Sequence, residues 1–436
     1  MRALVRPARR LLGTLTVPGD KSISHRAAIL GGLATGLTEV QGFLEGEDCL
    51  GTLRALAAMG VEAVRKGPGH YLIQGVGPDG LQEPETVLDC GNSGTTARLL
   101  LGVLAGQPFT AVLTGDDSLR RRPMERVVRP LTRMGATVVG RAGGRRLPLA
   151  ITGARPLRGL THPLEVASAQ VKSALLLAGL RAAGPVTVVE PAPSRDHTER
   201  MLRAFGVPLE VAPGRVTLTP GAWPAGRLVQ VPGDLSSAAF FLVAGLLLPE
   251  GSVTVKGVGV NPTRTGLLEV LEAMGAGLAV GPTGGDGEPL ADLTARTAAL
   301  RGVEVGGPLI PRLIDEVPIL AVAATAAQGV TEIRDAGELR VKESDRLGAL
   351  AGELARLGAA VEERPDGLRI RGGRRLRGAT VSSRGDHRIA MALIVAGLLA
   401  EGRTVVEGVE CIETSYPEFI ATLGRLVGEG CLEVAL

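Results

Sequence analysis

A repeat of about 70 residues runs through the whole chain and limits the folds that it can adopt. Six amphipathic stretches each end on a large apolar residue followed by glycine, and these closing glycines lie at positions 60, 135, 206, 275, 358 and 428. A glycine after the last helical turn supplies the left-handed conformation that ends a helix. The recurrence therefore predicts one supersecondary unit used six times along the 436 residues.

A second kind of segment lies between these stretches, rich in Ala and Leu and apolar on almost every side. A helix that is apolar all round is a buried helix. Most of these segments lead to a glycine and a β-branched alternating run, which predicts a strand. We therefore expect an α/β fold in which each unit holds a buried helix, a strand, a surface helix and further strands. The expected buried helices are Ala27–Thr35, Ala97–Gly106, Val171–Ala183, Ala238–Leu248, Val317–Ala327 and Ile389–Leu399.

The repeat also predicts where two halves of the chain meet. The sequence Val-Pro-Gly-Asp at 17–20 recurs at 231–234, and both copies precede serine and a buried helix. This offset of about three units predicts two similar domains, 19–232 and 1–18 plus 233–436, with chain crossings near Pro18 and Pro232. Proline and glycine at both crossings suit a hinge. We expect the active site in the cleft between the domains.

Charge and composition exclude several classes of protein. A net charge of +3 and an aromatic content of 2% are too low for a nucleic-acid-binding surface. Every apolar run is interrupted by Gly, Pro or charge before it could span a bilayer. The four cysteines are far apart and have no CxxC spacing, which indicates neither a zinc site nor a disulfide framework. A reducing, cytoplasmic setting fits this cysteine usage.

The buried segments begin with the most polar clusters of the sequence. A helix N-terminus offers free N–H groups and a positive dipole end, and both bind anions. Ser, Thr, Asn and Asp at such positions are also ordinary helix caps, and capping is the favoured interpretation for the cluster at 234–237. Cations oppose the helix dipole at this end, so Lys21, Arg26, Arg98 and Arg388 indicate an anionic ligand. The clusters are Asp20–Arg26, Gly91–Arg98, Ala167–Lys172, Asp234–Ser237, Asp315–Glu316 and Gly385–Arg388.

Two further charged segments join this set. Leu119–Met124 places three arginines before a helix expected to start at Pro123, with a solvated basic turn as the alternative. Val341–Arg346 places Lys342 and Arg346 at i and i+4, which predicts that they share one helix face. A surface helix with internal ion pairs is the alternative for this second segment.

Together these motifs resemble the 5-enolpyruvylshikimate-3-phosphate synthase family of enolpyruvyl transferases over essentially the whole chain. The resemblance implies two domains, each of three βαβαββ units around buried helices, in an inside-out α/β barrel. It implies transfer of the enolpyruvyl group of phosphoenolpyruvate to the 5-hydroxyl of shikimate 3-phosphate, by a monomer that needs no metal or organic cofactor and binds neither nucleic acid nor membrane. The matching segments are Pro18–Arg26, Gly91–Arg98, Arg122–Met124, Ser168–Gln170, Val341–Arg346 and Asp386–Arg388.

The resemblance also implies roles for individual residues. Those expected to bind phosphoenolpyruvate are Lys21, Asn92, Gly94, Arg122, Gln170, Arg346 and Arg388. Those expected to bind shikimate 3-phosphate are Ser22, Arg26, Ser168, Ala169, Gln170, Ser194, Arg195, Asp315 and Lys342. The candidates for proton transfer are Lys21, Asp315 and Glu343.

The sequence departs from the best-known bacterial pattern of the family in several places. Ala169 follows Ser168 where a second serine is common, and His197 stands where tyrosine is common. A lysine often found near the C-terminus is missing, and Ile412–Pro417 occupies that region, which leaves open what contacts phosphate there. Gly94 keeps the small residue at the tight phosphate-side position, which implies sensitivity to glyphosate-like mimics of phosphoenolpyruvate.

Two other functions remain as alternatives. The sister transferase that acts on UDP-N-acetylglucosamine carries Lys-Asn in the first motif and a reactive cysteine in the later loop. This chain has Lys21-Ser22 and no cysteine in the corresponding segment, 116–122. A non-catalytic phosphosugar-binding protein would not need Glu343 or Asp315 beside the cations.

Overall fold

The computed structural model describes residues 1–285 and 287–435, which form two compact units. The N-terminal unit comprises Gly19–Val231 together with Gly287 and Glu288, and the C-terminal unit comprises Met1–Pro18, Pro232–Gly285 and the chain from Pro289 onward. The chain passes from one unit to the other after Pro18 and again after Val231. Each unit has its own hydrophobic core.

The described residues of the N-terminal unit form three four-stranded sheets with one shared pairing pattern. The sheet orders are β14-β3-β5-β4, β6-β7-β9-β8 and β10-β11-β13-β12. In each sheet the first pair is parallel and the other two are antiparallel. The strands are β3 Thr35–Gln41, β4 Glu62–Gly67, β5 His70–Val76, β6 Leu88–Asp89, β7 Thr110–Thr114, β8 Thr137–Gly140, β9 Leu149–Thr152, β10 Leu160–Pro163, β11 Val186–Val189, β12 Leu209–Ala212, β13 Arg215–Leu218 and β14 Leu228–Gln230.

The described part of the C-terminal unit repeats this pattern. Its sheets have the orders β2-β15-β17-β16, β18-β19-β21-β20 and β22-β23-β1-β24, again with one parallel and two antiparallel pairs. The strands are β1 Arg2–Val5, β2 Arg10–Thr16, β15 Glu250–Gly259, β16 Leu278–Val280, β17 Leu290–Arg296, β18 Glu304–Val305, β19 Val330–Ile333, β20 Ala360–Arg364, β21 Gly367–Arg371, β22 Thr380–Ser382, β23 Thr404–Glu407 and β24 Leu432–Ala435. These mixed sheets confirm the predicted α/β class.

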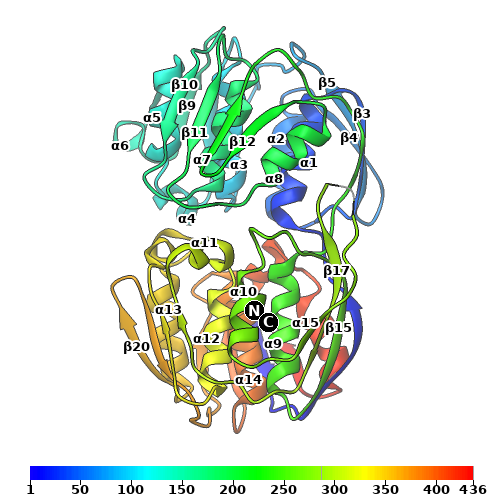
Figure 1. The fold of residues 1–436 in the computed structure, drawn as a ribbon, viewed down its shortest axis with the longest axis vertical. Coiled ribbons are helices and arrows are strands. Elements are labelled where there is room, and N and C mark those ends of the chain that lie inside the picture. Colours follow the sequence, from blue (N-terminus) through cyan, green and yellow to red (C-terminus); the bar gives the residue numbers. More distant parts are fainter. Residues whose placement is uncertain (286, 436) are drawn as a thin grey trace. The chain divides into compact units, whose positions relative to one another are not determined.

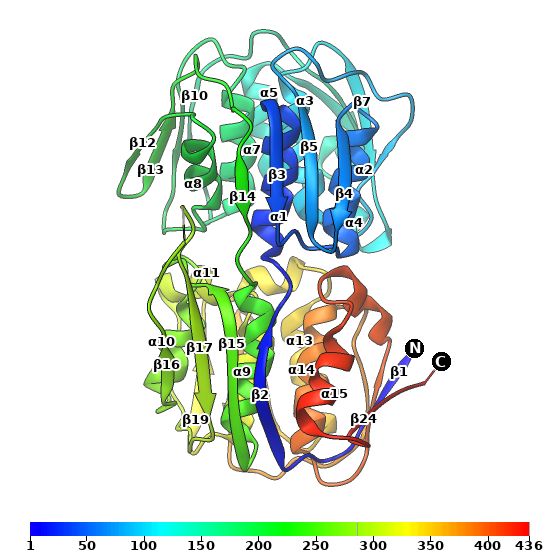
Figure 2. The same ribbon diagram turned by 90° about the vertical axis from the view of Figure 1, so that its right-hand side faces the viewer.

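Strands from distant parts of the chain complete both units. In the N-terminal unit, β14 pairs with β3 through Leu228 opposite Glu39, and Figure 2 shows the green β14 beside the blue β3. In the C-terminal unit, β2 pairs with β15 through Thr14 opposite Thr254, and β1 lies between β23 and β24. A strand from the end of the N-terminal unit's main segment thus completes a sheet that contains the start of that segment. In the C-terminal unit, strands from the first residues of the chain complete sheets formed by later residues.

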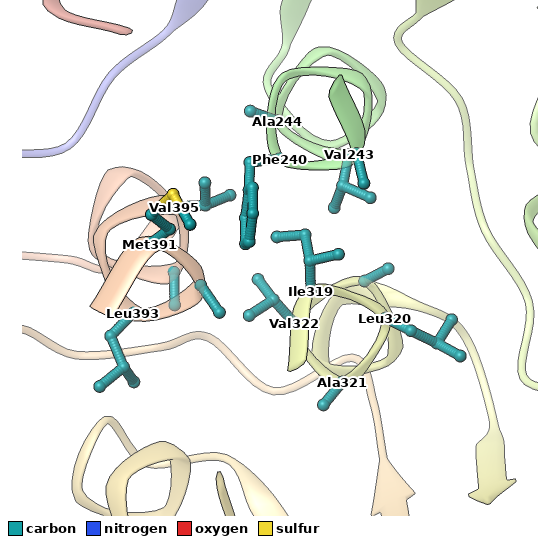
Figure 3. Packing of buried hydrophobic residues seen from close by; sticks show 14 of the residues in the cluster. Phe240, Val243, Ala244, Ile319, Leu320, Ala321, Val322, Met391, Leu393 and Val395 are labelled. Carbon is teal, nitrogen blue, oxygen red and sulfur yellow. The ribbon is translucent and has the colours of Figure 1, made fainter. Parts of the chain in front are cut away.

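Six helices of the described chain are buried almost all round, as their apolar composition predicts (Figure 1). In the C-terminal unit, side chains of three of them meet in one core, where Phe240 lies among Ile319, Val322, Met391 and Val395 (Figure 3). A helix buried in this way touches solvent mainly at its ends, so its first turn is where polar side chains gather. The buried helices are α1 Lys21–Leu33, α3 Gly94–Ala105, α7 Ala169–Gly179, α9 Leu235–Leu247, α12 Val317–Ala326 and α14 His387–Leu399.

Six amphipathic helices alternate with the buried ones. The glycine that follows each has a positive φ, between +86° and +119°, as predicted for glycine at a helix end, although Gly428 has a ψ of 162° and so leaves the left-handed helical region. These helices are α2 Glu47–Ala57, α5 Glu125–Met134, α8 His197–Ala204, α10 Gly266–Ala273, α13 Arg346–Arg356 and α15 Phe419–Val427. The shorter helices are α4 Asp117–Arg121, α6 Arg141–Gly144, α11 Ile310–Leu313, η1 Gly307–Leu309, η2 Gly337–Val341 and η3 Val409–Thr414.

Close packing of α3 against α7 fixes two of the helix ends that carry polar residues. A Cβ at Gly102 of α3 would lie 2.2 Å from the backbone oxygen of Ala174 in α7. Only glycine lets the two helices approach this closely.

We predict that Gly102→Ala lowers the free energy of unfolding of the N-terminal unit by about 1–3 kcal/mol, because the added methyl group forces α3 and α7 apart. Trp223, the one tryptophan of the chain, lies in this unit, so its fluorescence during urea denaturation reports the change. Gly51→Ala is the matched control, since a Cβ there lies 3.7 Å from Arg54 and makes an ordinary contact. Equal denaturation midpoints for Gly102→Ala and the wild type would contradict the packing argument.

Candidate active site

Serine and aspartate cap the first turns of the buried helices in the N-terminal unit. Asp20 accepts a hydrogen bond from the Ile23 N–H at 2.9 Å, Ser93 from the Thr96 N–H at 3.1 Å, and Ser168 from the Val171 N–H at 3.4 Å. Ser168 is therefore a helix cap as well as a predicted ligand residue. These caps fix the first turns, on which Lys21, Gly94, Ala169 and Gln170 lie.

The start of α1 carries two cations held by different partners. The ammonium of Lys21 pairs with the carboxylate of Asp48 in α2, and the side chains are 14% and 7% exposed. Arg26 is buried and donates to the backbone oxygen of Ser22 at 2.8 Å. Burial lowers the pKa of Arg26 to about 10, although the charges of Glu199 and Asp20 raise it, so Arg26 stays protonated at neutral pH.

Asp48 was not predicted from the sequence. It lies in an amphipathic helix 27 residues after Lys21, and its neighbours in sequence carry no motif. Only the packing of α1 against α2 brings the two side chains together.

Asn92 and Arg122 meet before α3. Arg122, which is 7% exposed, donates from Nη2 to Asn92 Oδ1 at 2.6 Å, and Asn92 donates to Asp116 Oδ2 at 2.6 Å. A Cβ at Gly94 would lie 2.8 Å from Arg98 Nη1 and 3.3 Å from Arg122 Nη1. The structure therefore brings the guanidinium groups of Arg98 and Arg122 to the first residue of α3. Two cations at one helix start can bind an anion such as a phosphate group.

Arg98 links this group to α7. Its Nη1 donates to Gln170 Oε1 at 2.6 Å and its Nη2 donates to the Pro123 oxygen at 2.9 Å. Gln170 in turn donates to Thr95 Oγ1 at 3.0 Å. The segment at Pro123 is not the start of a helix as predicted, because α4 ends at Arg121 with Arg122 as its C-cap, and α5 begins only at Glu125.

Ser194 and Arg195 lie on the loop between β11 and α8. Ser194 is buried, and the charge of Arg195 adds a smaller contribution to the lowering of the Arg26 pKa that burial causes. The loop thus places a hydroxyl and a guanidinium near the predicted anion ligand Arg26.

Of the five site residues predicted in the C-terminal unit, three cations lie around the carboxylate of a fourth, Asp315. Lys342 Nζ is 3.8 Å from Asp315 Oδ1, Arg346 Nη1 is 3.2 Å from the same oxygen, and Arg388 Nη2 is 3.9 Å from Oδ2. Arg346 also pairs with Glu343 Oε2 at 2.7 Å. Three cations thus gather at Asp315, and Glu343 lies beside them, so the cluster combines groups that can bind anions with carboxylates that can accept protons.

Arg346 is the most enclosed of these cations. Its side chain is 1% exposed and its Nε is 2.8 Å from Oδ2 of Asp386, the residue that caps α14. Burial lowers the pKa of Arg346, but the carboxylates of Asp386, Glu343 and Asp315 outweigh burial and raise it overall. Its positive charge is therefore permanent, and the three carboxylates fix its position.

The prediction that Lys342 and Arg346 share one helix face is wrong. Lys342 follows η2 with extended backbone angles (φ −82°, ψ −152°), and α13 begins only at Arg346 after its cap, Asp345. The Asp345 carboxylate accepts from the Gly348 N–H at 3.1 Å, which starts the helix there. Both cations nevertheless reach Asp315, from an extended segment and from a helix start.

The segment that replaces the family's C-terminal lysine contributes to packing. Within Ile412–Pro417 the sequence has neither Lys nor Arg, and Thr414 Oγ1 donates to the Cys411 oxygen at 2.8 Å. Tyr416 is buried against Phe241 and Phe419, and burial raises its pKa to about 12.

No helix within residues 1–285 or 287–435 combines the length and hydrophobicity that a membrane crossing needs. The same residues contain no cluster of three or more His, Cys, Asp or Glu side chains that could hold a metal ion.

The sequence and fold match known proteins over nearly their full length. The family model described as EPSP synthase (3-phosphoshikimate 1-carboxyvinyltransferase) matches residues 5–423. The chain belongs to the EPSP synthase family. The resemblance carried by the helix-start motifs is thereby confirmed.

Relatives from the EPSP synthase family align with this chain over nearly its full length and nearly their own. A 3-phosphoshikimate 1-carboxyvinyltransferase of Desulforudis audaxviator is 55% identical over 98% of this chain and 99% of its own length. One of Synechococcus sp. is 57% identical over 97% and 96%. A structure of EPSP synthase from Acinetobacter baumannii is 43% identical, with a TM-score of 0.88 and complete coverage of both chains.

A more distant structure shares the fold. The enolpyruvyl transferase NikO from Streptomyces tendae has a TM-score of 0.78 at 20% identity, over 98% of this chain and 97% of that one. The fold is thus kept where most of the sequence differs.

His25, next to the predicted site residues of α1, makes the stability of the N-terminal unit depend on pH. It is 0% exposed and its Nδ1 is 2.7 Å from Thr52 Oγ1. Burial, then the charges of Lys21 and Arg26, hold its pKa well below the ordinary value. The unfolded chain protonates at about pH 6.5, so folded-state stability is lost as the pH falls below that value.

We predict that His25→Gln weakens this loss, because the amide can still bond to Thr52 but takes up no proton. Trp223 fluorescence in urea at pH 7.5 and pH 5.0 gives the free energy of unfolding of the N-terminal unit. The difference between the two pH values should be smaller in the variant, by up to about 1.4 kcal/mol per pH unit. The same difference in both proteins would show that His25 is not the titrating group.

Proposed function

We propose that the chain transfers the enolpyruvyl group of phosphoenolpyruvate to the 5-hydroxyl of shikimate 3-phosphate through a tetrahedral intermediate, with release of phosphate, in the shikimate pathway. Family membership and the full-length relatives support this reaction. The observation that carries it is the cluster of Lys342, Arg346 and Arg388 around Asp315, beside Glu343. Such a cluster combines binding of anions with groups that can move protons.

We extend the proposal to the architecture. The three sheets of each unit would enclose its buried helices as an inside-out α/β barrel. The crossings at 18–19 and 231–232 would act as a hinge, and residues of both units would act on the same two substrates. Every proposed site residue comes from one chain, so a monomer suffices for the reaction.

Shikimate 3-phosphate would bind to cationic side chains through its phosphate and to polar side chains through its hydroxyl groups. Its phosphate would bind to the guanidinium groups of Arg26 and Arg195 and to N–H groups at the start of α7. The N–H groups of a first helical turn have no carbonyl acceptor within the helix. Its hydroxyls would meet Asp315. The full set for this substrate is Ser22, Arg26, Ser168, Ala169, Gln170, Ser194, Arg195, Asp315 and Lys342.

Phosphoenolpyruvate would bind through Lys21, Asn92, Gly94, Arg122, Gln170, Arg346 and Arg388. Arginines hold phosphate and carboxylate with paired hydrogen bonds, which suits a substrate that carries both groups. The guanidinium of Arg346 is taken by three carboxylates, so the substrate carboxylate would have to displace one of them. The side chain of Glu343 is 17% exposed, against 12% for Asp315 and 0% for Asp386, which makes Glu343 the most accessible for displacement.

The displaced Glu343 would then be free to move a proton. The reaction removes a proton from the 5-hydroxyl as its oxygen attacks C2 of phosphoenolpyruvate, adds a proton at C3, and then expels phosphate. Lys21, Asp315 and Glu343 are the proposed proton carriers. The cations hold two polyanions together, which supplies proximity and stabilises charge that develops on the leaving phosphate, so the residues themselves provide the required charge.

We predict that the purified chain releases phosphate when both substrates are present, and that Lys21→Met and Glu343→Gln each slow this release by about 100-fold or more. A phosphate assay under substrate saturation measures the effect. Lys66→Met and Glu362→Gln are matched controls, because they remove exposed charges of the same kinds on β4 and β20. No release from the wild type would overturn the proposal.

We also predict that glyphosate-like mimics of phosphoenolpyruvate inhibit the wild type and inhibit Gly94→Ala less. The new methyl group would displace the guanidinium groups of Arg98 and Arg122, against which it lies at 2.8 Å and 3.3 Å. The ratio of the inhibition constants measures this, with Gly51→Ala as a control. An unchanged inhibition constant for Gly94→Ala would contradict the assignment of Gly94.

A further inference from the structure

Lys172 lies at the centre of a buried ionic cluster in the N-terminal unit, outside the residues assigned above. Its side chain is 1% exposed. Its ammonium is 2.8 Å from Glu190 Oε2, 2.7 Å from Glu199 Oε1 and 3.4 Å from the backbone oxygen of Ser194. The three N–H bonds of an ammonium can thus all be used.

The cluster includes a second cation, so that its charges balance. Arg26 donates to Thr198 Oγ1 at 2.6 Å and to Ser173 Oγ at 2.7 Å, and these two hydroxyl oxygens are 2.6 Å apart. Thr198 precedes Glu199 in α8, and Ser173 follows Lys172 in α7. The two cations of the cluster, Lys172 and Arg26, therefore match its two carboxylates, Glu190 and Glu199.

Burial without a charged partner would disfavour the anionic form of the carboxylates in this cluster. Burial raises the pKa of Glu199, and the adjacent Lys172 opposes that rise. An uncompensated buried carboxylate costs several kcal/mol or takes up a proton, so the anionic form depends on Lys172.

The cluster holds the loop that carries two proposed ligands of shikimate 3-phosphate. The hydroxyl of Ser194 donates to Oε1 of Glu190, the carboxylate whose other oxygen pairs with Lys172. Lys172 also holds the Ser194 backbone oxygen, directly before Arg195. Through Arg26, the same cluster reaches the backbone oxygen of Ser22.

The hydrogen bonds that Asn92 and Gln170, two residues proposed to bind phosphoenolpyruvate, make within the described part of the chain do not involve Lys172, Glu190 or Glu199. Asn92 bonds to Arg122 and to Asp116, and Gln170 bonds to Arg98 and Thr95. A change at Lys172 should therefore act on the two substrates unequally.

We propose that Lys172 is a positioning residue for shikimate 3-phosphate, acting through Glu190 and Glu199 on Ser194, Arg195 and Arg26. The inference rests on the proposed assignment of Ser194 and Arg195 to this substrate. A residue that acts through others in this way fixes the ligand geometry, and a misplacement of about 1 Å lowers binding and rate steeply.

The test compares KM values for the two substrates in Lys172→Met and in Lys172→Met/Glu199→Gln. The single variant leaves two carboxylates against one cation and should lose stability. The double variant restores the charge balance, and its stability should recover in part, but Glu190 and Ser194 still lack their ammonium partner. We expect the KM for shikimate 3-phosphate to rise about tenfold or more in both variants, and the KM for phosphoenolpyruvate to change less than about threefold.

Two controls separate the possible outcomes. Leu177→Ala removes a buried side chain of the same helix, so it should lower stability and leave both KM values unchanged. Arg195→Ala tests the underlying assignment: if it leaves the KM for shikimate 3-phosphate unchanged, the assignment of this loop fails. If Arg195→Ala raises that KM while the folded double variant keeps the wild-type value, the role of Lys172 is refuted.

Discussion

A helix that is apolar on every side can touch water only at its ends, and this constraint organises the whole molecule. Each buried helix must be enclosed by sheets and amphipathic helices, which the repeated unit supplies three times in each part of the chain. Polar residues on such a helix therefore gather near its ends, and those of the second turn, such as Arg26 and Ser173, have polar partners within the protein. The first turn also offers free N–H groups and the positive dipole end, so anion binding gathers there.

The cations at these helix starts have internal partners, which sharpens what they indicate. Lys21 pairs with Asp48, and Arg346 pairs with Asp386, Glu343 and Asp315. A cation at a helix N-terminus is therefore not by itself a sign of an anionic ligand. The stronger sign is the crowding of three cations around the single carboxylate of Asp315, with Glu343 on its partly exposed side.

Much of the fold could be predicted because its signals are local and repeated. The six closing glycines and the six apolar segments fix the helix types, and all of them are found in the structure. The extended segment at Lys342 was missed because its spacing to Arg346 imitates one helical turn, while the cap at Asp345 starts the helix later. Asp48 was missed, and Lys172 was included in a helix-start cluster but given no role, because their contacts are with residues distant in sequence, which one sequence does not reveal.

The two sets of residues proposed for the two substrates are held in place by different contacts. Asn92, Gly94 and Arg122 form one group before α3, tied to α7 through Arg98. Ser194, Arg195 and Arg26 depend on a buried ionic cluster between α7 and α8. Both groups contact the first two turns of α7, from Ala169 to Ser173, so in the proposed assignment this one helix start would serve both substrates.

The most direct test is a crystal structure of the chain with shikimate 3-phosphate and a non-reactive mimic of phosphoenolpyruvate. Anion binding at the helix starts predicts that the anionic groups of both ligands lie within hydrogen-bond distance of first-turn residues of α1, α3 and α7, with the second ligand also contacting Arg346 or Arg388. Ligands bound away from those helix starts, or bound without contact to Lys21, Arg122 or Arg195, would contradict it.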